Sequence, residues 1–220
     1  MLRTENRPLP SGRLQPLEVL WFGLSLSLGG LLYLALTLRD PLPVLVVWLT
    51  LASYVLIYTP LKRYSVWNTV VGAVPGALPP VIGWTGMGGP LGAEVLLLFG
   101  VLFLWQLPHF YAIAWIYRDD YSRAGLRMFP VVDARGGRTA WQMVVFSALL
   151  LIASLAPGLS RQAGPVYLLG AASLGLFFWL ATLGFLRHRS VAEARRVMRA
   201  SLVYLPLLLV LLVVDRTLLT

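Results

Sequence analysis

The chain has 220 residues, of which 58% are hydrophobic and only 12% are charged, and its mean hydropathy is +0.77. A soluble domain of this length needs about a quarter of its residues charged to cover its surface, so lipid is expected to cover most of this one. The net charge of +9 in so apolar a chain indicates membrane orientation rather than nucleic-acid binding, and the absence of cysteine excludes disulfides and thiolate metal sites.

Seven apolar runs are long enough to cross a bilayer, which takes roughly 20 residues. The first run follows a basic stretch, but it is longer than a signal-peptide core and no cleavage site follows it, so we expect it to remain as a span. Short connections indicate one helical bundle, and residues 1–220 are expected to form a single transmembrane domain. The expected spans are Leu17–Leu38, Leu42–Tyr58, Trp67–Trp84, Leu91–Tyr117, Thr139–Leu159, Pro165–Leu186 and Val197–Val214.

The basic residues divide unequally between the connections. With a cytoplasmic N-terminus, the inner segments hold 15 of the 18 Lys and Arg residues. These segments are 1–16, 59–66, 118–138 and 187–199. Since basic loops stay on the cytoplasmic side, this bias supports the span count and predicts an integral protein of a bacterial-type inner membrane with its N-terminus in the cytoplasm.

The third span, Trp67–Trp84, departs from a plain helix because it contains Pro75, Pro79 and Pro80. Each internal proline removes a backbone hydrogen bond and clashes with the preceding turn. Broken backbone at membrane depth has to be buried in protein or to line a wet cavity, and such segments often lie beside substrate. The alternative is a simply kinked helix.

The fourth span, Leu91–Tyr117, would be about 40 Å long if straight, which exceeds the hydrocarbon core. Pro108 is expected to kink it, with Gln106 and His109 on either side of the kink. Polar groups within a span tend to face the bundle interior. His109 is therefore interpreted either as a hydrogen-bonded structural group or as a binding or proton-transfer residue.

The next loop opens with two carboxylates, Asp119 and Asp120, flanked by Arg118 and Arg123. We expect the pair at the C-terminal end of the long helix, where the helix dipole disfavours negative charge unless a cation is bound. One interpretation is a pair neutralised by its arginines at a wet surface. The other is a Mg²⁺ site, because Mg²⁺ takes one or two protein carboxylates and completes its shell with substrate phosphates.

Three further cations, Lys62, Arg63 and Arg7, are expected on the same side of the membrane. They are interpreted either as ordinary anchors on the positive inner face or as groups that stabilise charge on a departing diphosphate. A lipid diphosphate would then bind with its head at the rim and its hydrocarbon tail in the bundle.

Several strings, spread in order along residues 3–132, carry a likeness to a known family that runs through most of this range. They are Arg3-Thr4-Glu5-Asn6-Arg7-Pro8-Leu9-Pro10-Ser11-Gly12, Tyr58-Thr59-Pro60-Leu61-Lys62-Arg63, Asn68-Thr69-Val70-Val71-Gly72-Ala73-Val74-Pro75-Gly76-Ala77-Leu78-Pro79-Pro80, Gly83-Trp84, Trp105-Gln106-Leu107-Pro108-His109-Phe110, Asp120-Tyr121 with Ala124-Gly125, and Met128-Phe129-Pro130-Val131-Val132. Through these strings the chain closely resembles the haem O synthases (protohaem IX farnesyltransferases), which are UbiA-type prenyltransferases. The likeness is weaker beyond residue 132.

The resemblance implies an all-α, polytopic membrane bundle of nine helices with a cytoplasmic-side active site. It implies transfer of farnesyl from farnesyl diphosphate to a vinyl group of haem b, with Mg²⁺ assisting the loss of diphosphate. The implied partners are farnesyl diphosphate, haem b and membrane lipid, with a possible association with terminal oxidase assembly or haem A synthase. Nucleic acid is not an implied partner. Aromatic faces such as those of Trp84, Trp105, Phe110 and Tyr111 could stabilise an allylic cation.

The resemblance also implies roles for individual residues. Catalytic roles are expected for Asp120, Lys62, Arg63 and His109, and metal ligation for Asp119 and Asp120, with Asp120 the principal ligand. Substrate binding is expected for Arg3, Arg7, Asn68, Trp105, Gln106, Tyr121 and Arg123.

The chain departs from the family pattern in two ways. The family's first metal motif, Asn-x-x-x-Asp-x-x-x-Asp, precedes the Arg3–Gly12 string, at which this chain begins. The seven spans are therefore expected to correspond to the family's nine without the first two. The chain alone is expected to have little activity. Met1 is interpreted as an internal methionine rather than as the start of a truncated product. In the later motif, Arg123 and Ala124 stand where related families place a second aspartate.

Three other functions compete with this one. A UbiA-type enzyme could act on a quinone precursor or another aromatic acceptor, which the Trp105–Phe110 string argues against. A transporter or non-catalytic membrane subunit would not bind farnesyl diphosphate in a magnesium-dependent way. The last alternative is an inactive remnant.

Overall fold

The structure is a computed structural model that describes residues 4–160 and 162–219, and every regular element in that part of the chain is helical. The elements are α1 (Pro16–Thr37), α2 (Leu42–Ala52), η2 (Ser53–Tyr58), α3 (Thr59–Tyr64), α4 (Asn68–Ala77), α5 (Pro79–Gly86), α6 (Ala93–Ile116), α7 (Arg118–Arg123), α8 (Phe129–Val132), α9 (Gly137–Leu159), α10 (Pro165–His188) and α11 (Val191–Leu219). The predicted all-α fold class is confirmed.

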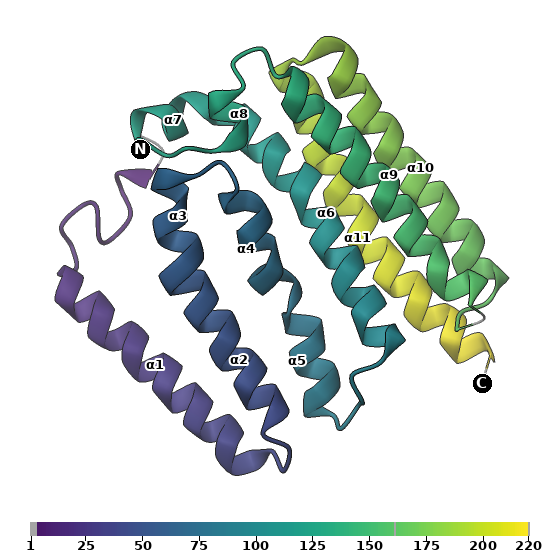
Figure 1. Cartoon of the computed structure of the whole chain (residues 1–220), viewed down its shortest axis with the longest axis horizontal. Helices are drawn as coiled ribbons and strands as arrows, with labels where there is room; N and C mark the ends of the chain where they lie inside the picture. The colour runs from purple at the N-terminus through teal and green to yellow at the C-terminus, as the bar shows by residue number, and fades with distance from the viewer. Residues whose placement is uncertain (1–3, 161, 220) are drawn as a thin grey trace.

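Six helical stretches in the described residues are long and apolar enough to cross a membrane. They are Pro16–Thr37, Leu42–Tyr64, Ala93–Ile116, Gly137–Leu159, Pro165–His188 and Val191–Asp215. The predicted span Trp67–Trp84 is not a single helix but two short ones, α4 and α5, that meet at Leu78 and follow one another along the bundle (Figure 1). The break falls there because neither Pro79 nor Pro80 has an N–H with which to continue the hydrogen-bond ladder of α4.

The second span runs six residues further than its predicted end at Tyr58. The segment η2 is a π-helical turn in which the N–H of Thr59 donates to the carbonyl oxygen of Tyr54, and α3 continues directly from it. Pro60 lies in the first turn of α3, where a missing N–H costs little. Lys62 and Arg63 therefore lie in the last turn of a helix rather than in a loop.

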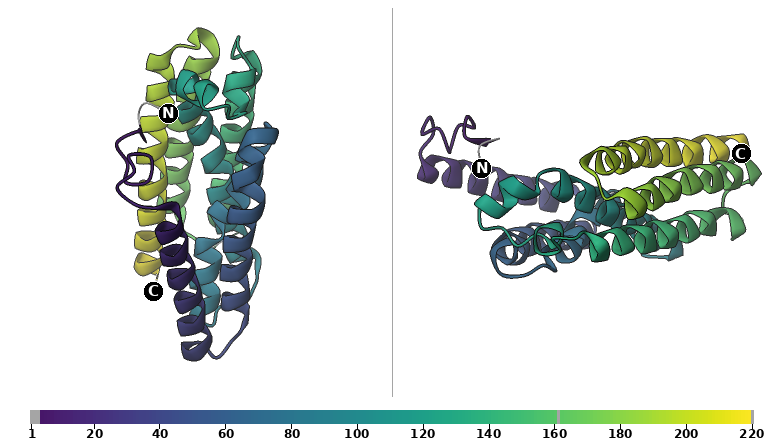
Figure 2. Two further views of the ribbon diagram at one scale, coloured as in Figure 1. Left: turned by 90° about the vertical axis from the view of Figure 1, so that its left-hand side faces the viewer. Right: turned by 90° about the horizontal axis from the view of Figure 1, so that it is seen from above.

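The core lies among four long helices, α6, α9, α10 and α11, which pack against one another along their lengths (Figure 1, Figure 2). Its largest fully buried side chains come from these helices, among them Tyr111, Tyr167, Phe178 and Tyr204. The helices α2, α4 and α5 pack beside this group through α6, whereas α1 packs against α2 and buries none of its residues. An apolar helix with most of its side chains exposed is suited to contact with lipid.

The connections alternate between two ends of the bundle. The N-terminal segment, α3, α7, α8 and the turn between α10 and α11 lie at one end, and the α1–α2, α5–α6 and α9–α10 connections lie at the other (Figure 1). The four arginine-rich segments grouped by the sequence analysis thus share one end, which we call the basic end.

Candidate functional site

At the basic end, backbone and side-chain hydrogen bonds join α3 and α4 to the loop between α7 and α8. The N–H of Arg127 donates to the carbonyl oxygen of Lys62 at 2.8 Å. The side-chain amide of Asn68 donates to the carbonyl oxygens of Arg127 at 2.9 Å and Ser65 at 2.5 Å. Asn68 is fully buried and its oxygen accepts from Thr69, so its polar groups hold the loop and do not face open space.

Asp119 and Asp120 lie in the first turn of α7 and not, as expected, at the C-terminal end of α6. The helix α6 stops at Tyr117, whose backbone angles (φ −110°, ψ 24°) are not helical, and α7 begins with Arg118. This interruption reverses the local electrostatics, because the first turn of a helix favours carboxylates and the last turn disfavours them.

The two carboxylates differ in exposure. The Asp120 side chain is 18% exposed and its Oδ1 accepts a hydrogen bond from Nη2 of Arg123 at 2.5 Å. The Asp119 side chain is 87% exposed and lies 3.9 Å from Nε of Arg118. Within the described residues, no group of three or more His, Cys, Asp or Glu side chains could hold a metal ion. Asp119 and Asp120 thus offer a metal two carboxylates, and Mg²⁺ typically takes one or two when substrate phosphates complete its shell.

Lys62 lies over aromatic rings. Its Nζ is 4.2 Å from the centre of the Tyr58 ring and 5.9 Å from that of Tyr54, and these two rings of η2 contact each other with centres 4.9 Å apart. No carboxylate of the described residues forms an ion pair with Lys62. Its charge is therefore held in place by ring faces without being neutralised, which leaves it available to an anion.

Gln106 faces α4. It is buried, and its amide nitrogen donates to the carbonyl oxygens of Leu102 at 3.1 Å and Ala73 at 3.4 Å. Gly76 of α4 makes this possible, because a Cβ at that position would collide with the side-chain oxygen of Gln106. Gly76, in the broken span, therefore leaves the space that the side-chain amide of Gln106 occupies.

Trp105 and His109 face α11 instead. The indole N–H of Trp105 donates to the carbonyl oxygen of Ser201 at 2.8 Å, and Nδ1 of His109 lies 2.6 Å from the Ser201 hydroxyl oxygen. The two rings stack with their centres 4.8 Å apart and an interplanar angle of 15°. The polar side chains of the string Trp105–His109 thus divide between two neighbouring helices, α4 and α11.

The remaining residues that the sequence analysis predicted for the site do not all lie at the basic end. Arg3 lies outside the described residues, Arg7 is exposed in the N-terminal segment, and Arg63 is exposed at the end of α3. Tyr121 is half-buried on α7. Trp84 belongs to the opposite end of the bundle, where its indole N–H donates to the carbonyl oxygen of Pro90 at 2.8 Å, so it is far from the α7 carboxylates.

Of the remaining aromatic candidates, Tyr111 is 1% exposed and its ring centre lies 5.9 Å from that of Phe129 on α8. Phe110, by contrast, is 39% exposed. Of these two candidates, only Phe110 therefore presents aromatic surface, and Tyr64, Trp67 and Trp141 are further exposed aromatic side chains at the basic end.

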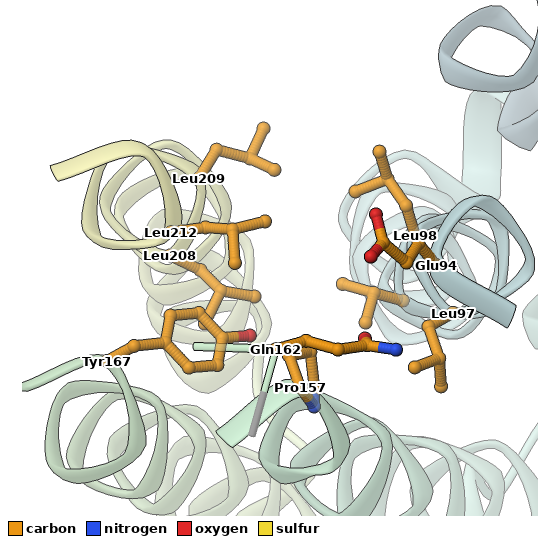
Figure 3. A pocket seen from close by; sticks show the side chains of 10 residues that line it. Glu94, Leu97, Leu98, Pro157, Gln162, Tyr167, Leu208, Leu209 and Leu212 are labelled. Atoms are coloured by element: carbon orange, nitrogen blue, oxygen red, sulfur yellow. The ribbon is translucent and has the colours of Figure 1, made fainter. Parts of the chain in front are cut away.

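A small cavity of about 40 Å³ lies between α6, α9 and α11 near the end away from α7 (Figure 3). It is lined by Glu94, Leu97, Leu98, Val101, Pro157, Gln162, Tyr167, Leu208, Leu209 and Leu212. Pockets for small molecules commonly measure about 300–1,000 Å³, so this cavity has room for water molecules and not for a prenyl chain.

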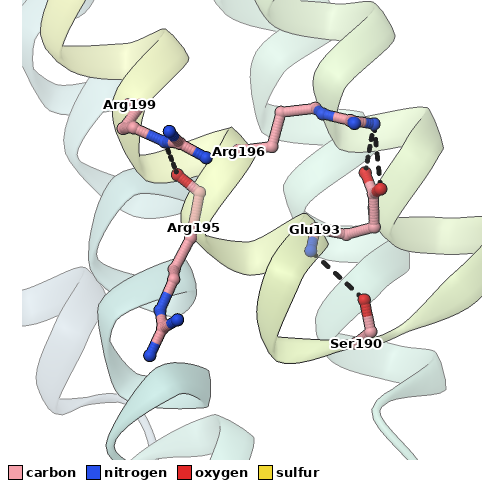
Figure 4. Close-up of polar contacts among 5 residues, drawn as sticks. All are labelled: Ser190, Glu193, Arg195, Arg196 and Arg199. Carbon is pink, nitrogen blue, oxygen red and sulfur yellow. Dashed lines mark hydrogen bonds and ion pairs between the residues drawn. The ribbon is translucent and has the colours of Figure 1, made fainter.

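The start of α11 adds charge to the basic end that the sequence analysis did not assign to the site. Glu193 accepts from the N–H groups of Arg196 at 2.8 and 3.0 Å, and its backbone N–H is capped by Ser190 (Figure 4). Arg195 and Arg199 form no ion pair with a carboxylate of the described residues. Arg195 points away from the Glu193 pair, and Nε of Arg199 donates to the carbonyl oxygen of Arg195 at 3.4 Å (Figure 4). Both arginines contribute positive charge at the same end as Lys62.

The UbiA prenyltransferase family matches residues 1–203 of the chain. Protoheme IX farnesyltransferase of Solibacter usitatus is 47% identical over 98% of this chain and 74% of its own length. The enzymes of the same name from Koribacter versatilis and Salinibacter ruber are 42% and 44% identical, and this chain covers 72% and 76% of their lengths.

A solved structure described as digeranylgeranylglyceryl phosphate synthase in membranes superimposes with a TM-score of 0.78 over 97% of this chain and 75% of that one. At 19% identity, this likeness shows the shared fold. The family match and the near relatives agree with the helical bundle and with the resemblance of residues 3–132. The chain therefore belongs to the UbiA prenyltransferase family, within its protoheme IX farnesyltransferase group, and is an integral membrane prenyltransferase.

Proposed function

We propose that the protein transfers a farnesyl group from farnesyl diphosphate to a vinyl group of protohaem IX, which gives haem O. The observation that carries the proposal is the hydrogen-bonded contact between α3 and the α7–α8 loop, which gathers carboxylates and an unneutralised Lys62 at one end of an apolar bundle. The near relatives are named protoheme IX farnesyltransferases, which supports a farnesyl donor and protohaem IX as the acceptor.

In this proposal the diphosphate binds at the basic end. Lys62 and Arg63, with Arg7 from the N-terminal segment, stabilise the charge that develops on the departing group. Tyr121 and Arg123 of α7 contact the diphosphate. Arg123 also holds the carboxylate of the half-buried Asp120 in place through their ion pair. Arg3 is proposed as a further diphosphate ligand.

Two adjacent carboxylates in one helical turn, one of them highly exposed, are chemically suited to Mg²⁺, so Asp120, with Asp119, is proposed to hold the ion. When bound, Mg²⁺ would neutralise charge on the diphosphate oxygens. The arginines at positions 118 and 123 limit the negative charge that these aspartates present on their own.

The string Trp105, Gln106 and His109 is proposed to bind the acceptor. Asn68 acts in this proposal by holding the α7–α8 loop, since its amide is fully engaged. We further propose that residues 1–220 work as one transmembrane domain in a bacterial-type inner membrane, with the basic end in the cytoplasm. An association with terminal oxidase assembly or haem A synthase would use the haem O that forms.

The test is incubation of the protein, as the source organism makes it, with farnesyl diphosphate, haem b and Mg²⁺ in bilayers, with the products separated by chromatography. Haem O that forms only when both substrates and Mg²⁺ are present is the expected result. Prenylation of a quinone precursor with no product from haem b would replace the proposal with its nearest alternative. Farnesyl diphosphate binding that does not respond to Mg²⁺ would contradict the metal assignment.

A further inference from the structure

Ser201 of α11 is in contact with two of the proposed acceptor-binding residues of α6, although 92 residues separate it from His109. The two helices lie side by side (Figure 1). Its carbonyl oxygen accepts from the Trp105 indole, and its hydroxyl lies 2.6 Å from Nδ1 of His109. Ser201 is fully buried, and His109 is 9% exposed. The serine therefore fixes both rings from a helix for which the sequence analysis assigned no functional residue.

The proton of the Ser201 hydroxyl is committed to a backbone acceptor. The hydroxyl oxygen lies 2.6 Å from the carbonyl oxygen of Met198, one turn earlier on α11. A carbonyl oxygen cannot donate, so the single hydroxyl proton has to lie between these two oxygens. If the hydroxyl donated to His109 instead, two oxygen lone pairs would face each other at that distance without a hydrogen between them.

The commitment of that proton decides the tautomer of His109. Since the hydroxyl donates to Met198, it can only accept from the imidazole, and Nδ1 of His109 must carry the hydrogen. A neutral imidazole has one N–H, so Nε2 then carries a lone pair. Nε2 has no hydrogen-bond partner among the described residues and is not one of their buried unpartnered atoms, so it reaches accessible space.

We propose that Ser201 is a positioning residue that holds His109 as the Nδ1–H tautomer and so presents the lone pair of Nε2 to the acceptor substrate. The stacked Trp105 ring, itself hydrogen-bonded to Ser201, fixes the plane of the imidazole. The part of the proposal that concerns the acceptor rests on the proposed function, whereas the tautomer does not. The lone pair is available either to accept a proton or to coordinate the iron of haem.

The tautomer can be read without any enzymatic assay, because the chain has only two histidines. The protein is labelled with ¹⁵N-histidine, and the ring-nitrogen shifts separate protonated from bare nitrogens. His188→Gln removes the second signal and assigns the first. The wild-type protein is expected to show a protonated Nδ1 and a bare Nε2. Ser201→Ala should shift His109 toward the other tautomer, and Ser201→Thr, which keeps a hydroxyl, should restore the wild-type pattern.

Ser147→Ala is the matched control. Ser147 of α9 is as buried as Ser201, and its hydroxyl bonds to a helix carbonyl oxygen and to Thr182 and not to His109. It should leave the ¹⁵N spectrum and the activity unchanged. A protonated Nε2 in the wild-type protein, or a His109 spectrum that Ser201→Ala leaves unaltered, would overturn the tautomer and with it the proposal.

Activity tests the positioning role. Groups that hold the far nitrogen of a functional imidazole are worth about 10–100-fold where the ring binds a metal, and we expect a loss of that size in haem O formation for Ser201→Ala and recovery for Ser201→Thr. A haem b titration distinguishes the two uses of the lone pair, since iron coordination by Nε2 changes the haem absorbance. Full activity in a Ser201→Ala protein with the altered tautomer would overturn the positioning role. A wild-type protein with the expected tautomer and no haem O would count against the proposed function alone.

Discussion

Asn68 and Arg127 are separated by 59 residues, and the side-chain amide of Asn68 donates to the carbonyl oxygen of Arg127 at 2.9 Å. The same amide nitrogen donates to the carbonyl oxygen of Ser65, which fixes the turn between α3 and α4. A single buried side chain therefore connects the loop after the α7 carboxylates to the helix that carries Lys62. The relative position of Asp120 and Lys62 depends on this connection.

Replacing Asn68 with Ala is expected to loosen that loop. Two backbone carbonyl oxygens lose a donor, and each buried group left unpaired costs about 1–3 kcal/mol. We expect a lower melting temperature and faster proteolytic cleavage between α7 and α8, together with weaker binding of farnesyl diphosphate. Limited proteolysis in detergent, followed by mass spectrometry of the fragments, measures the first effect directly.

Asn6→Ala is a suitable control for that experiment, because Asn6 is exposed in the N-terminal segment and its carbonyl oxygen, not its side chain, accepts from Arg13. It should leave the cleavage pattern as it is. An Asn68→Ala protein with the wild-type cleavage rate would show that the loop is held by other contacts.

Adding one methyl group at Gly76 is expected to displace the Gln106 amide. A Cβ at this position would overlap the side-chain oxygen of Gln106, and the flexible end of that side chain can turn away. Gly76→Ala should therefore fold but lose the hydrogen bonds from Gln106 to Ala73 and Leu102. Because Gln106 is proposed to contact the acceptor, we expect weaker binding of haem b with little change in binding of farnesyl diphosphate.

Gly83→Ala provides the matched comparison, since Gly83 lies on the second half of the same broken span and a Cβ there meets no atom within 4 Å. Alanine favours a helix over glycine by about 1 kcal/mol, so this variant should be at least as stable as the wild-type protein. Equal haem b binding by the two variants, measured by absorbance titration, would remove the Gln106 assignment.

The sequence predicted the large features of the fold because they follow from composition. Runs of apolar residues predicted the spans, and the uneven distribution of arginine predicted that four segments lie at the same end of the bundle. Both features depend on whether a segment meets lipid or water and not on which side chains it packs against. The break near Pro79 also follows from a local cause, the missing N–H of proline.

The sequence did not predict the contacts between helices. Gln106 and His109 are three residues apart on α6, yet they bond to α4 and α11, and only the packing of those helices decides which neighbour each one meets. Ser201 left no local signal for the same reason. The end of α6 at Tyr117 was predicted, but the short helix α7 that begins at Arg118 was missed, so the carboxylates were expected after the end of α6 and not in the first turn of a second helix.

Replacing Asp120 with Asn is expected to abolish turnover, whereas Asp119→Asn should have a milder effect. Asp120 is mostly buried and is held by Arg123, so its carboxylate has one fixed position, while Asp119 is 87% exposed and free to turn. Both changes keep the shape of the side chain and remove its charge. The measurement is the rate of haem O formation over a range of Mg²⁺ concentrations, in the protein as the source organism makes it. Equal tolerance of both substitutions would remove the metal assignment.

The orientation of the bundle can be tested with single cysteines, because the chain contains none of its own. Ser122 is exposed on α7 at the basic end, and Ser160 is exposed at the other end, after α9. If the basic end is cytoplasmic, a membrane-impermeant maleimide added to intact spheroplasts should label Ser160→Cys and not Ser122→Cys. Ser122→Cys should become reactive once the membrane is permeabilised. The reverse pattern would place the carboxylates, Lys62 and the proposed diphosphate site on the outer face, where neither the arginine distribution nor a cytoplasmic supply of prenyl diphosphate would be explained.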